Sequence, residues 1–289
     1  MKLLLALTLF ALVQDPVEKA KKVLEKTPDD PAANLTMGVY CADRGKWDLA
    51  LPFFEKVKSP EIRAALDAEK KLDGNQFTLV EVGDAWAKGL KGPARQACFD
   101  RMNLHYSAAW EKLDDFGKMK LRDRLSKLYA PAAPGKPNAE ALAGWGGVLG
   151  AASKIEIVGV KVRSGGLALR YTPKDTTKGT VTSSKPIPVT PGKKLEVSAW
   201  VLTDGTDGAG DSILFAVRDG KGGYSWSNGV PIRPDFPVWT RISGETVLPD
   251  GSFSAEVQIT FNSKAGSLFV DDLSIKLDGK ELLTRGNFE

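Results

Sequence analysis

Two periods of hydrophobic residues divide this chain. From residue 16 to about residue 129, apolar and small side chains recur every three or four positions, which predicts amphipathic helices. The clearest stretch is 31–57, where a break at 43–45 separates two helices and Gly45 suits a left-handed helix C-cap. From Trp145 onward, apolar and polar residues alternate, which predicts strands with one buried face.

Turn signals such as Pro-Gly and Asp-Gly separate the segments that carry this alternation. The predicted strands are residues 153–163, 167–172, 179–187, 194–203, 212–218, 240–247, 255–261 and 268–277. About eight short strands with such punctuation predict an antiparallel β-sandwich of the jelly-roll type. Before them, residues 130–143 contain Pro131, Pro134 and Pro137, which oppose a continuing helix and predict an extended linker.

The predicted fold class is therefore a multi-domain α and β protein, with a helical domain over 15–129 and a sandwich over 144–289. A chain of 289 residues is long enough for two such cores. The composition, 42% hydrophobic and 26% charged, is that of a globular protein. The net charge of +4 comes from cations interspersed with acidic residues, so we expect no nucleic-acid partner.

The first 14 residues, MKLLLALTLFALVQ, place Lys2 before an apolar run. That run has the length of a signal-peptide core and is shorter than the ~20 residues that span a bilayer. The abrupt polar helix start after Asp15 favours a signal peptide, whereas the lack of an A-x-A cleavage motif favours a buried first helix. We expect residues 1–14 to be a signal peptide, no transmembrane segment, and a secreted, periplasmic or cell-surface protein.

The sequence carries none of the common catalytic patterns. His105 is the single histidine and lies in a predicted helix, and H-E-x-x-H, G-x-S-x-G, P-loop and Rossmann motifs are absent. Cys41 and Cys98 fall on predicted helix faces, where free cysteine packs as a small hydrophobe, although export would permit a disulfide. We therefore expect a protein that is not an enzyme.

The helical half resembles a tetratricopeptide repeat over 31–57, through the spacing G-x-W-x-x-A-x-x-x-F. The resemblance implies that Gly38 and Ala50 allow close helix packing and that Phe54 fills the gap. Asn34 departs from the pattern, because it stands where a large aromatic residue is usual. A groove that binds a protein partner and a spacer role are the alternatives that the resemblance leaves open.

The strings TPGKKLEVSAWVLTDG, VWTRISGETVLP and SLFVDDLSI resemble the galactose-binding-like jelly rolls, especially the carbohydrate-binding modules of glycoside hydrolases. The resemblance implies a jelly-roll fold and a glycan or polysaccharide ligand. Such modules often hold a structural calcium beside the aspartate of the final strand. Asp271 matches that aspartate, and Glu289 would join it if residues 286–289 take the place of the usual first strand. The alternative is an ordinary terminal strand with turn-forming aspartates.

A sugar site needs aromatic rings that stack on sugar rings, with amide or charged groups beside them. Tyr224 and Trp226 lie in a polar stretch that predicts a loop, where we expect them to be exposed. Trp200, Gln258 and Asn262 lie opposite the apolar residues of their own strands. They would line one groove if the polar faces of the two strands meet, and otherwise the rings cover the edge of the sandwich.

The expected function is an exported, non-catalytic binding protein. Its sandwich would bind a carbohydrate or a glycosylated surface, and its helical domain would act as a spacer or a docking site for a protein. The alternative is a protein–protein scaffold of a cell-surface or periplasmic assembly, in which the sandwich is purely structural.

Overall fold

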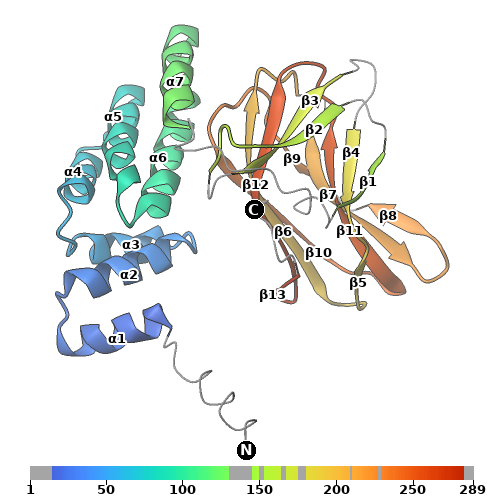
Figure 1. Cartoon of the computed structure of the whole chain (residues 1–289), viewed down its shortest axis with the longest axis horizontal. Helices are drawn as coiled ribbons and strands as arrows, with labels where there is room; N and C mark the ends of the chain where they lie inside the picture. The colour runs from blue at the N-terminus through green and yellow to red at the C-terminus, as the bar shows by residue number, and fades with distance from the viewer. Residues whose placement is uncertain are drawn as a thin grey trace, which may run out of the picture. The chain divides into compact units, whose positions relative to one another are not determined.

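A computed structural model describes residues 15–129, 145–149, 153–163, 167–174, 180–208, 210–226 and 229–282. The chain divides into two compact units, Met1–Leu113 and Asp114–Glu289. The first is helical, and the second contains two antiparallel sheets (Figure 1). The predicted fold class, a helical domain followed by an antiparallel β-sandwich, is confirmed.

The first unit is built from short helices with well-formed starts. They are α1 (Pro16–Lys26), α2 (Pro31–Ala42), α3 (Trp47–Phe54), α4 (Pro60–Glu69), α5 (Gln76–Ala87), the 3₁₀ turn η1 (Lys88–Lys91) and α6 (Arg95–Trp110). The side chains of Asp15, Asp30, Ser59 and Asn75 accept hydrogen bonds from the first-turn amides of α1, α2, α4 and α5. Among the described helices, none combines the length and the apolar character that crossing a bilayer would need.

Close packing of α2 on α3 depends on a glycine. A Cβ atom at Gly38 would lie 2.7 Å from the ring of Phe54, so only glycine allows this approach. Ala50 and Phe54 are fully buried at the same contact. The packing roles predicted for Gly38, Ala50 and Phe54 are thus confirmed, while the resemblance to a tetratricopeptide repeat stays a prediction.

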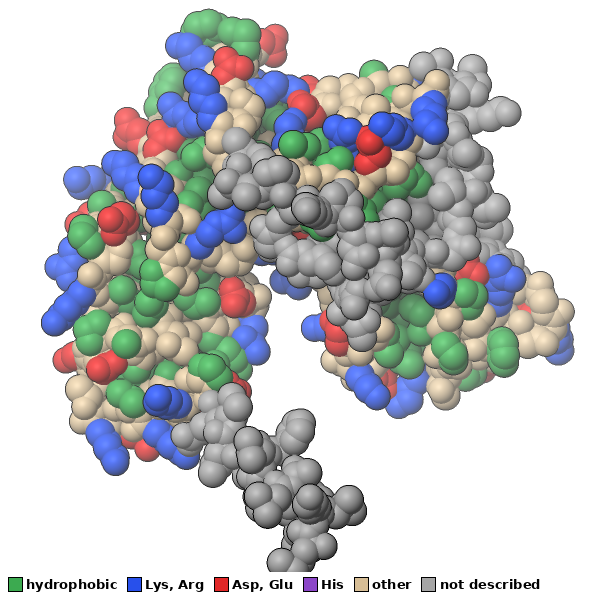
Figure 2. Space-filling model, in the orientation of Figure 1, with side chains coloured by type: hydrophobic (Ala, Val, Ile, Leu, Met, Phe, Trp, Pro, Cys, Tyr) green, Lys and Arg blue, Asp and Glu red, His purple; other side chains and the backbone are tan. Residues whose placement is uncertain are grey.

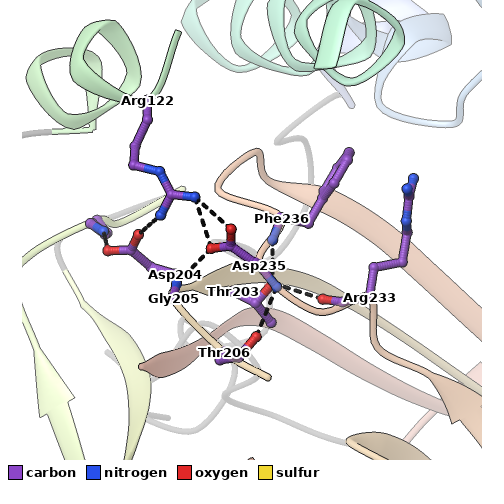
Figure 3. Close-up of polar contacts among 9 residues, drawn as sticks. Arg122, Thr203, Asp204, Gly205, Thr206, Arg233, Asp235 and Phe236 are labelled. Atoms are coloured by element: carbon purple, nitrogen blue, oxygen red, sulfur yellow. Dashed lines mark hydrogen bonds and ion pairs between the residues drawn. The ribbon is translucent and has the colours of Figure 1, made fainter. Parts of the chain in front are cut away.

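The second unit begins with α7 (Asp115–Leu128), a helix that the sequence analysis placed in the helical domain. The Arg122 guanidinium donates to Asp204 Oδ1 at 2.7 Å and to Asp235 Oδ1 at 2.8 Å (Figure 3). Asp204 also pairs with Lys161. Past the end of the helix, the Tyr129 hydroxyl accepts a hydrogen bond from the backbone N–H of Trp239 at 3.4 Å. These contacts hold α7 to the strand connections, and the boundary between the two units falls after Leu113 in the sequence.

Two antiparallel sheets form the rest of that unit. Sheet A contains β1 (Trp145–Leu149), β4 (Thr180–Ser184), β11 (Ser252–Phe261), β7 (Ser212–Asp219) and β8 (Tyr224–Trp226) in this order, with β5 (Ile187–Pro188) beside β11 and β9 (Val230–Pro231) beside β7. Sheet B contains β10 (Thr240–Val247), β6 (Lys194–Asp204), β12 (Ser267–Leu277), β3 (Ala168–Pro173) and β2 (Ser153–Val158), with β13 (Lys280–Glu281) beside β12.

The core lies between the two sheets and takes every second residue of β6 and β11. On β6 these residues are Leu195, Val197, Ala199 and Val201, and on β11 they are Ala255, Val257, Ile259 and Phe261. The face assignments made for both strands from their alternation are confirmed. The residues between them point to the outer face of their own sheet.

Candidate functional site

Three buried polar residues form a row on the outer face of sheet A. Ser254, Glu256 and Gln258 follow one another at alternate positions of β11, opposite in direction to the core residues of that strand. They are only 8%, 7% and 6% exposed. Polar side chains that face away from a core are usually solvated, so this degree of burial distinguishes the three residues from the rest of the outer face.

The neighbouring strand β7 supplies the second column of this face. Leu214, Ala216 and Arg218 pair with Gln258, Glu256 and Ser254 respectively. The Arg218 guanidinium donates to Glu256 Oε1 at 3.0 Å. The glutamate side chain is 9% exposed and the arginine side chain 52%, so the carboxylate is held on the sheet by a cation that reaches solvent. We call these six residues, Leu214, Ala216, Arg218, Ser254, Glu256 and Gln258, the sheet A site.

Tyr224 and Trp226 lie in a strand and not in a loop, which corrects the expectation from their polar surroundings. They begin and end β8, where they pair with Arg218 and Ala216. The polar stretch contains a tight turn, in which Asp219 Oδ1 accepts from the backbone N–H of Gly223 at 2.6 Å. That turn lets the chain return as a hairpin beside β7 (Figure 1). The two aromatic positions are therefore in register with the sheet A site, and their side chains lie outside the described part of the structure.

Trp200 belongs to the other sheet. It lies on β6, where it pairs with Arg241 of β10 and Asp271 of β12. Because Trp200 and Gln258 occupy the outer faces of different sheets, they do not line one groove, and that expectation is wrong. One side of the Trp200 ring is occupied by the Arg163 guanidinium, which lies 4.0 Å from the ring centroid.

Asn262 follows the end of β11 and is used by the local backbone. Its N–H donates to Asp211 Oδ1 at 2.7 Å, and its side-chain amide donates to the Gly210 carbonyl at 3.3 Å. Of the predicted sugar-contacting residues, Gln258 therefore lies in the same sheet as the strand of Tyr224 and Trp226, with β7 between them. Trp200 and Asn262 lie elsewhere.

A polar hollow of about 380 Å³ lies on the outer face of sheet B. Its two acidic side chains, Glu196 and Glu245, both pair with Lys194, at 2.8 Å and 3.1 Å. Arg241 and Ser198 also contribute to its wall. This hollow has polar groups but no described aromatic ring among its lining residues, so it offers hydrogen bonds without a stacking surface.

The predicted calcium ligands are not brought together by the described residues. Asp271 is fully buried, and its carboxylate accepts the backbone N–H groups of Arg163 at 3.0 Å and Asp272 at 2.8 Å. The neighbouring Asp272 carboxylate pairs with the Arg163 guanidinium. Glu289 lies outside the described residues. Within the described ranges no three His, Cys, Asp or Glu side chains gather as a metal site would require. The bonds that the Asp271 carboxylate accepts lie at the register shift of β12 between Asp271 and Ser274.

The helical unit contains a separate polar cluster that sequence reasoning missed. The Glu69 carboxylate accepts from Arg101 Nε at 2.5 Å, from Trp86 Nε1 at 2.8 Å and from His105 Nε2 at 2.7 Å. Burial raises the pKa of Glu69, but the hydrogen bonds from His105 and Arg101 outweigh it and lower the pKa to about 2. With every partner provided by the protein, the cluster joins α4, α5 and α6. His105 thus links α6 to α4 through Glu69.

The two cysteines do not form a disulfide. Cys41 and Cys98 are buried, free thiols on α2 and α6. Burial raises the pKa of Cys98 to about 12, which keeps this thiol protonated and unreactive. They pack as small hydrophobic side chains, as their positions on the predicted helix faces indicated.

No protein-family model matches the sequence, and no curated protein matches it. Among solved structures, the β part is similar to the xylan-binding domain CBM22-1 from Paenibacillus barcinonensis Xyn10C, with 19% sequence identity and a TM-score of 0.36. The match covers 46% of this chain and 85% of that domain. A family 16 carbohydrate-binding module has 13% identity, coverage of 49% and 97%, and a TM-score of 0.38. The enzymatically active domain of tailspike protein 4 from bacteriophage CBA120 has 14% identity, coverage of 53% and 22%, and a TM-score of 0.41.

The chain spans less than a quarter of the tailspike domain and most of the two modules. The similarity concerns the fold of the β part. Carbohydrate binding is the property given in the names of those two modules.

Proposed function

We propose that this chain is an exported, non-catalytic binding protein whose β-sandwich binds a carbohydrate at the sheet A site. The observation that carries the proposal is the row Ser254, Glu256 and Gln258, polar and nine-tenths buried on a face turned away from the core. Hydroxyl, carboxylate and amide groups in a row provide donors and acceptors for the hydroxyl groups of a sugar. The aromatic positions of β8 lie across β7 from Ser254 and Glu256 and in register with them, and aromatic rings on this face would stack sugar rings.

The ion pair in the site supports recognition of a neutral, hydroxylated ligand. Arg218 compensates the charge of Glu256, so the pair presents fixed acceptors and donors without a net charge. Groups held in place before binding lose little freedom when a ligand arrives, which favours affinity. On the same face, Leu214 is partly exposed beside the polar groups and adds an apolar contact.

The remaining parts of the proposal concern export and the helical unit. Export is supported by the signal-peptide pattern of residues 1–14. The helical unit would act as a spacer or a protein dock, and its pocket of about 230 Å³, lined by Leu35, Val57, Ile62 and Pro93 among others, supports the docking role.

The alternative is a protein–protein scaffold with a purely structural sandwich. The observation in its favour is the exposure of large apolar side chains on the helical unit, with Leu49 at 50%, Phe77 at 64% and Leu104 at 52%. Under this alternative the sheet A site would bind no glycan.

The test is a glycan array and a pull-down on insoluble polysaccharides with the full chain. We expect the wild-type protein to bind a glycan, and Glu256→Gln and Trp226→Ala each to weaken that binding. Glu245→Gln is the matched control, because Glu245 lies on the outer face of sheet B with its side chain 66% exposed. A correctly folded wild-type protein that binds no glycan would refute the proposal and favour the scaffold.

A further inference from the structure

A β-bulge at the start of β11 changes the direction of one aromatic residue. Ser252 pairs with Asp219 and Ser254 pairs with Arg218, so Phe253 is an extra residue that has no partner position on β7. Bulges of this kind redirect side chains and are frequent beside functional sites.

The register shows which face Phe253 occupies. Asp219 is two residues from the core residue Val217 and lies on the same side of β7, which places its partner Ser252 on the core side. The next residue, Phe253, therefore turns to the outer face, where Ser254 also lies. Its exposure of 69% agrees with this, whereas the two serines beside it are 6% and 8% exposed.

A neighbouring segment holds the backbone of Phe253 on one side. Phe253 has no partner position on β7, but on the opposite side its carbonyl accepts the N–H of Val189 at 3.2 Å, just after β5. Pro188 pairs with Ser254 and adds a second exposed apolar ring next to it. Figure 2 shows hydrophobic side chains at the surface of this end of the sandwich. An exposed aromatic ring at the end of a polar row, on a backbone that a neighbouring segment holds, has the character of a stacking surface.

We propose that Phe253 is a further ligand contact of the sheet A site, and that the ligand is a polysaccharide chain lying along β11. This inference rests on the proposed function. The row from Ser254 to Gln258 covers four residue steps, or ~14 Å at ~3.4 Å per residue, and Phe253 extends it at one end. A site of this length fits several consecutive sugar rings, whereas a site for one terminal sugar would use a small part of it.

The experiment measures the binding of cello-, xylo- and chito-oligosaccharides of two and six rings to the full chain by titration calorimetry. We expect the wild-type protein to bind the longer oligosaccharide of the preferred series more tightly. Phe253→Ala should weaken that binding about tenfold, because a stacked ring is lost, and should reduce the gain from two to six rings. Phe253→Tyr should keep it. Val247→Ala is the control, since Val247 is also exposed, at 67%, but belongs to sheet B.

The outcomes separate this inference from the function on which it rests. If the wild-type protein binds none of the oligosaccharides or insoluble polysaccharides, the proposed function fails. If it binds them, loses binding with Glu256→Gln, and is unchanged by Phe253→Ala, only the present inference is overturned. It is also overturned if Phe253→Ala turns a dimer into a monomer at unchanged glycan affinity, because Phe253 would then be a subunit contact.

Discussion

Replacing Glu69 by glutamine tests the polar cluster of the helical unit. In the folded protein the Glu69 carboxylate is held by Arg101, Trp86 and His105, and its side chain is 12% exposed. The pKa falls from 4.5 to about 2, a difference that corresponds to about 3 kcal/mol of stability for the ionised form. A glutamine keeps the shape of the side chain but leaves the Arg101 guanidinium without its counter-charge.

The contribution has a defined dependence on pH. Because the pKa of Glu69 in the folded state lies below its unfolded value, the stabilisation is fully present above a pH of 4.5 and is lost as the pH falls towards 2. We therefore expect Glu69→Gln to lower the free energy of unfolding by about 3 kcal/mol near neutral pH, and the difference from wild type to shrink steadily below pH 4.5.

Urea unfolding followed by far-ultraviolet circular dichroism measures this loss, since the helices dominate that signal. Glu81→Gln is the matched control, because Glu81 is an exposed residue of α5. It should change the free energy of unfolding by less than about 0.5 kcal/mol at any pH. A loss for Glu69→Gln no larger than for the control, or a loss independent of pH, would refute the reasoning.

Three further predictions concern the packing of both units. Arg122→Ala should free α7 from the strand connections, because it removes the bonds to Asp204 and Asp235. Amide hydrogen exchange over 115–128 should then become faster, whereas the control Lys127→Ala should leave the exchange rate unchanged. Gly38→Ala should destabilise the helical unit by about 1–3 kcal/mol, because the new Cβ atom would lie 2.7 Å from the Phe54 ring. Thermal unfolding measures this loss, and an unchanged stability would mean that α2 and α3 can separate freely. Cys98 should resist alkylation by iodoacetamide until the protein unfolds, because burial raises the pKa of its thiol to about 12; rapid labelling of the native protein would contradict this.

Local patterns in the sequence were sufficient to assign the faces of single elements. The alternation along β6 and β11 identified the core residues of both strands, and the small residues of α2 and α3 identified their contact. Such patterns reflect the period of one element, and that period depends on the backbone alone. They therefore work without knowledge of the neighbours.

Pairings between distant segments could not be predicted in this way. Parity places Trp200 and Gln258 on the outer faces of their strands, but it does not determine that the two strands join different sheets. The position of α7 could not be predicted for the same reason, because its Arg122 contacts Asp204 and Asp235, which are far away in the sequence. A proline-rich segment nearby looked like the boundary, although the ion pairs place α7 with the sandwich.

The sheet A site shows how this distinction bears on function. The polar row of the site can be read in the sequence as every second residue of β11. The position of Phe253 cannot be read in this way. If the alternation continued through Ser252, Phe253 and Ser254, the ring would point inward. The bulge reverses that direction and needs the register with β7 to be recognised. An aromatic residue that breaks the alternation and stays exposed costs stability when nothing covers it, because a large apolar surface remains in water. For this reason Phe253, and not a residue that follows the pattern, is the position at which a ligand of this face should be sought.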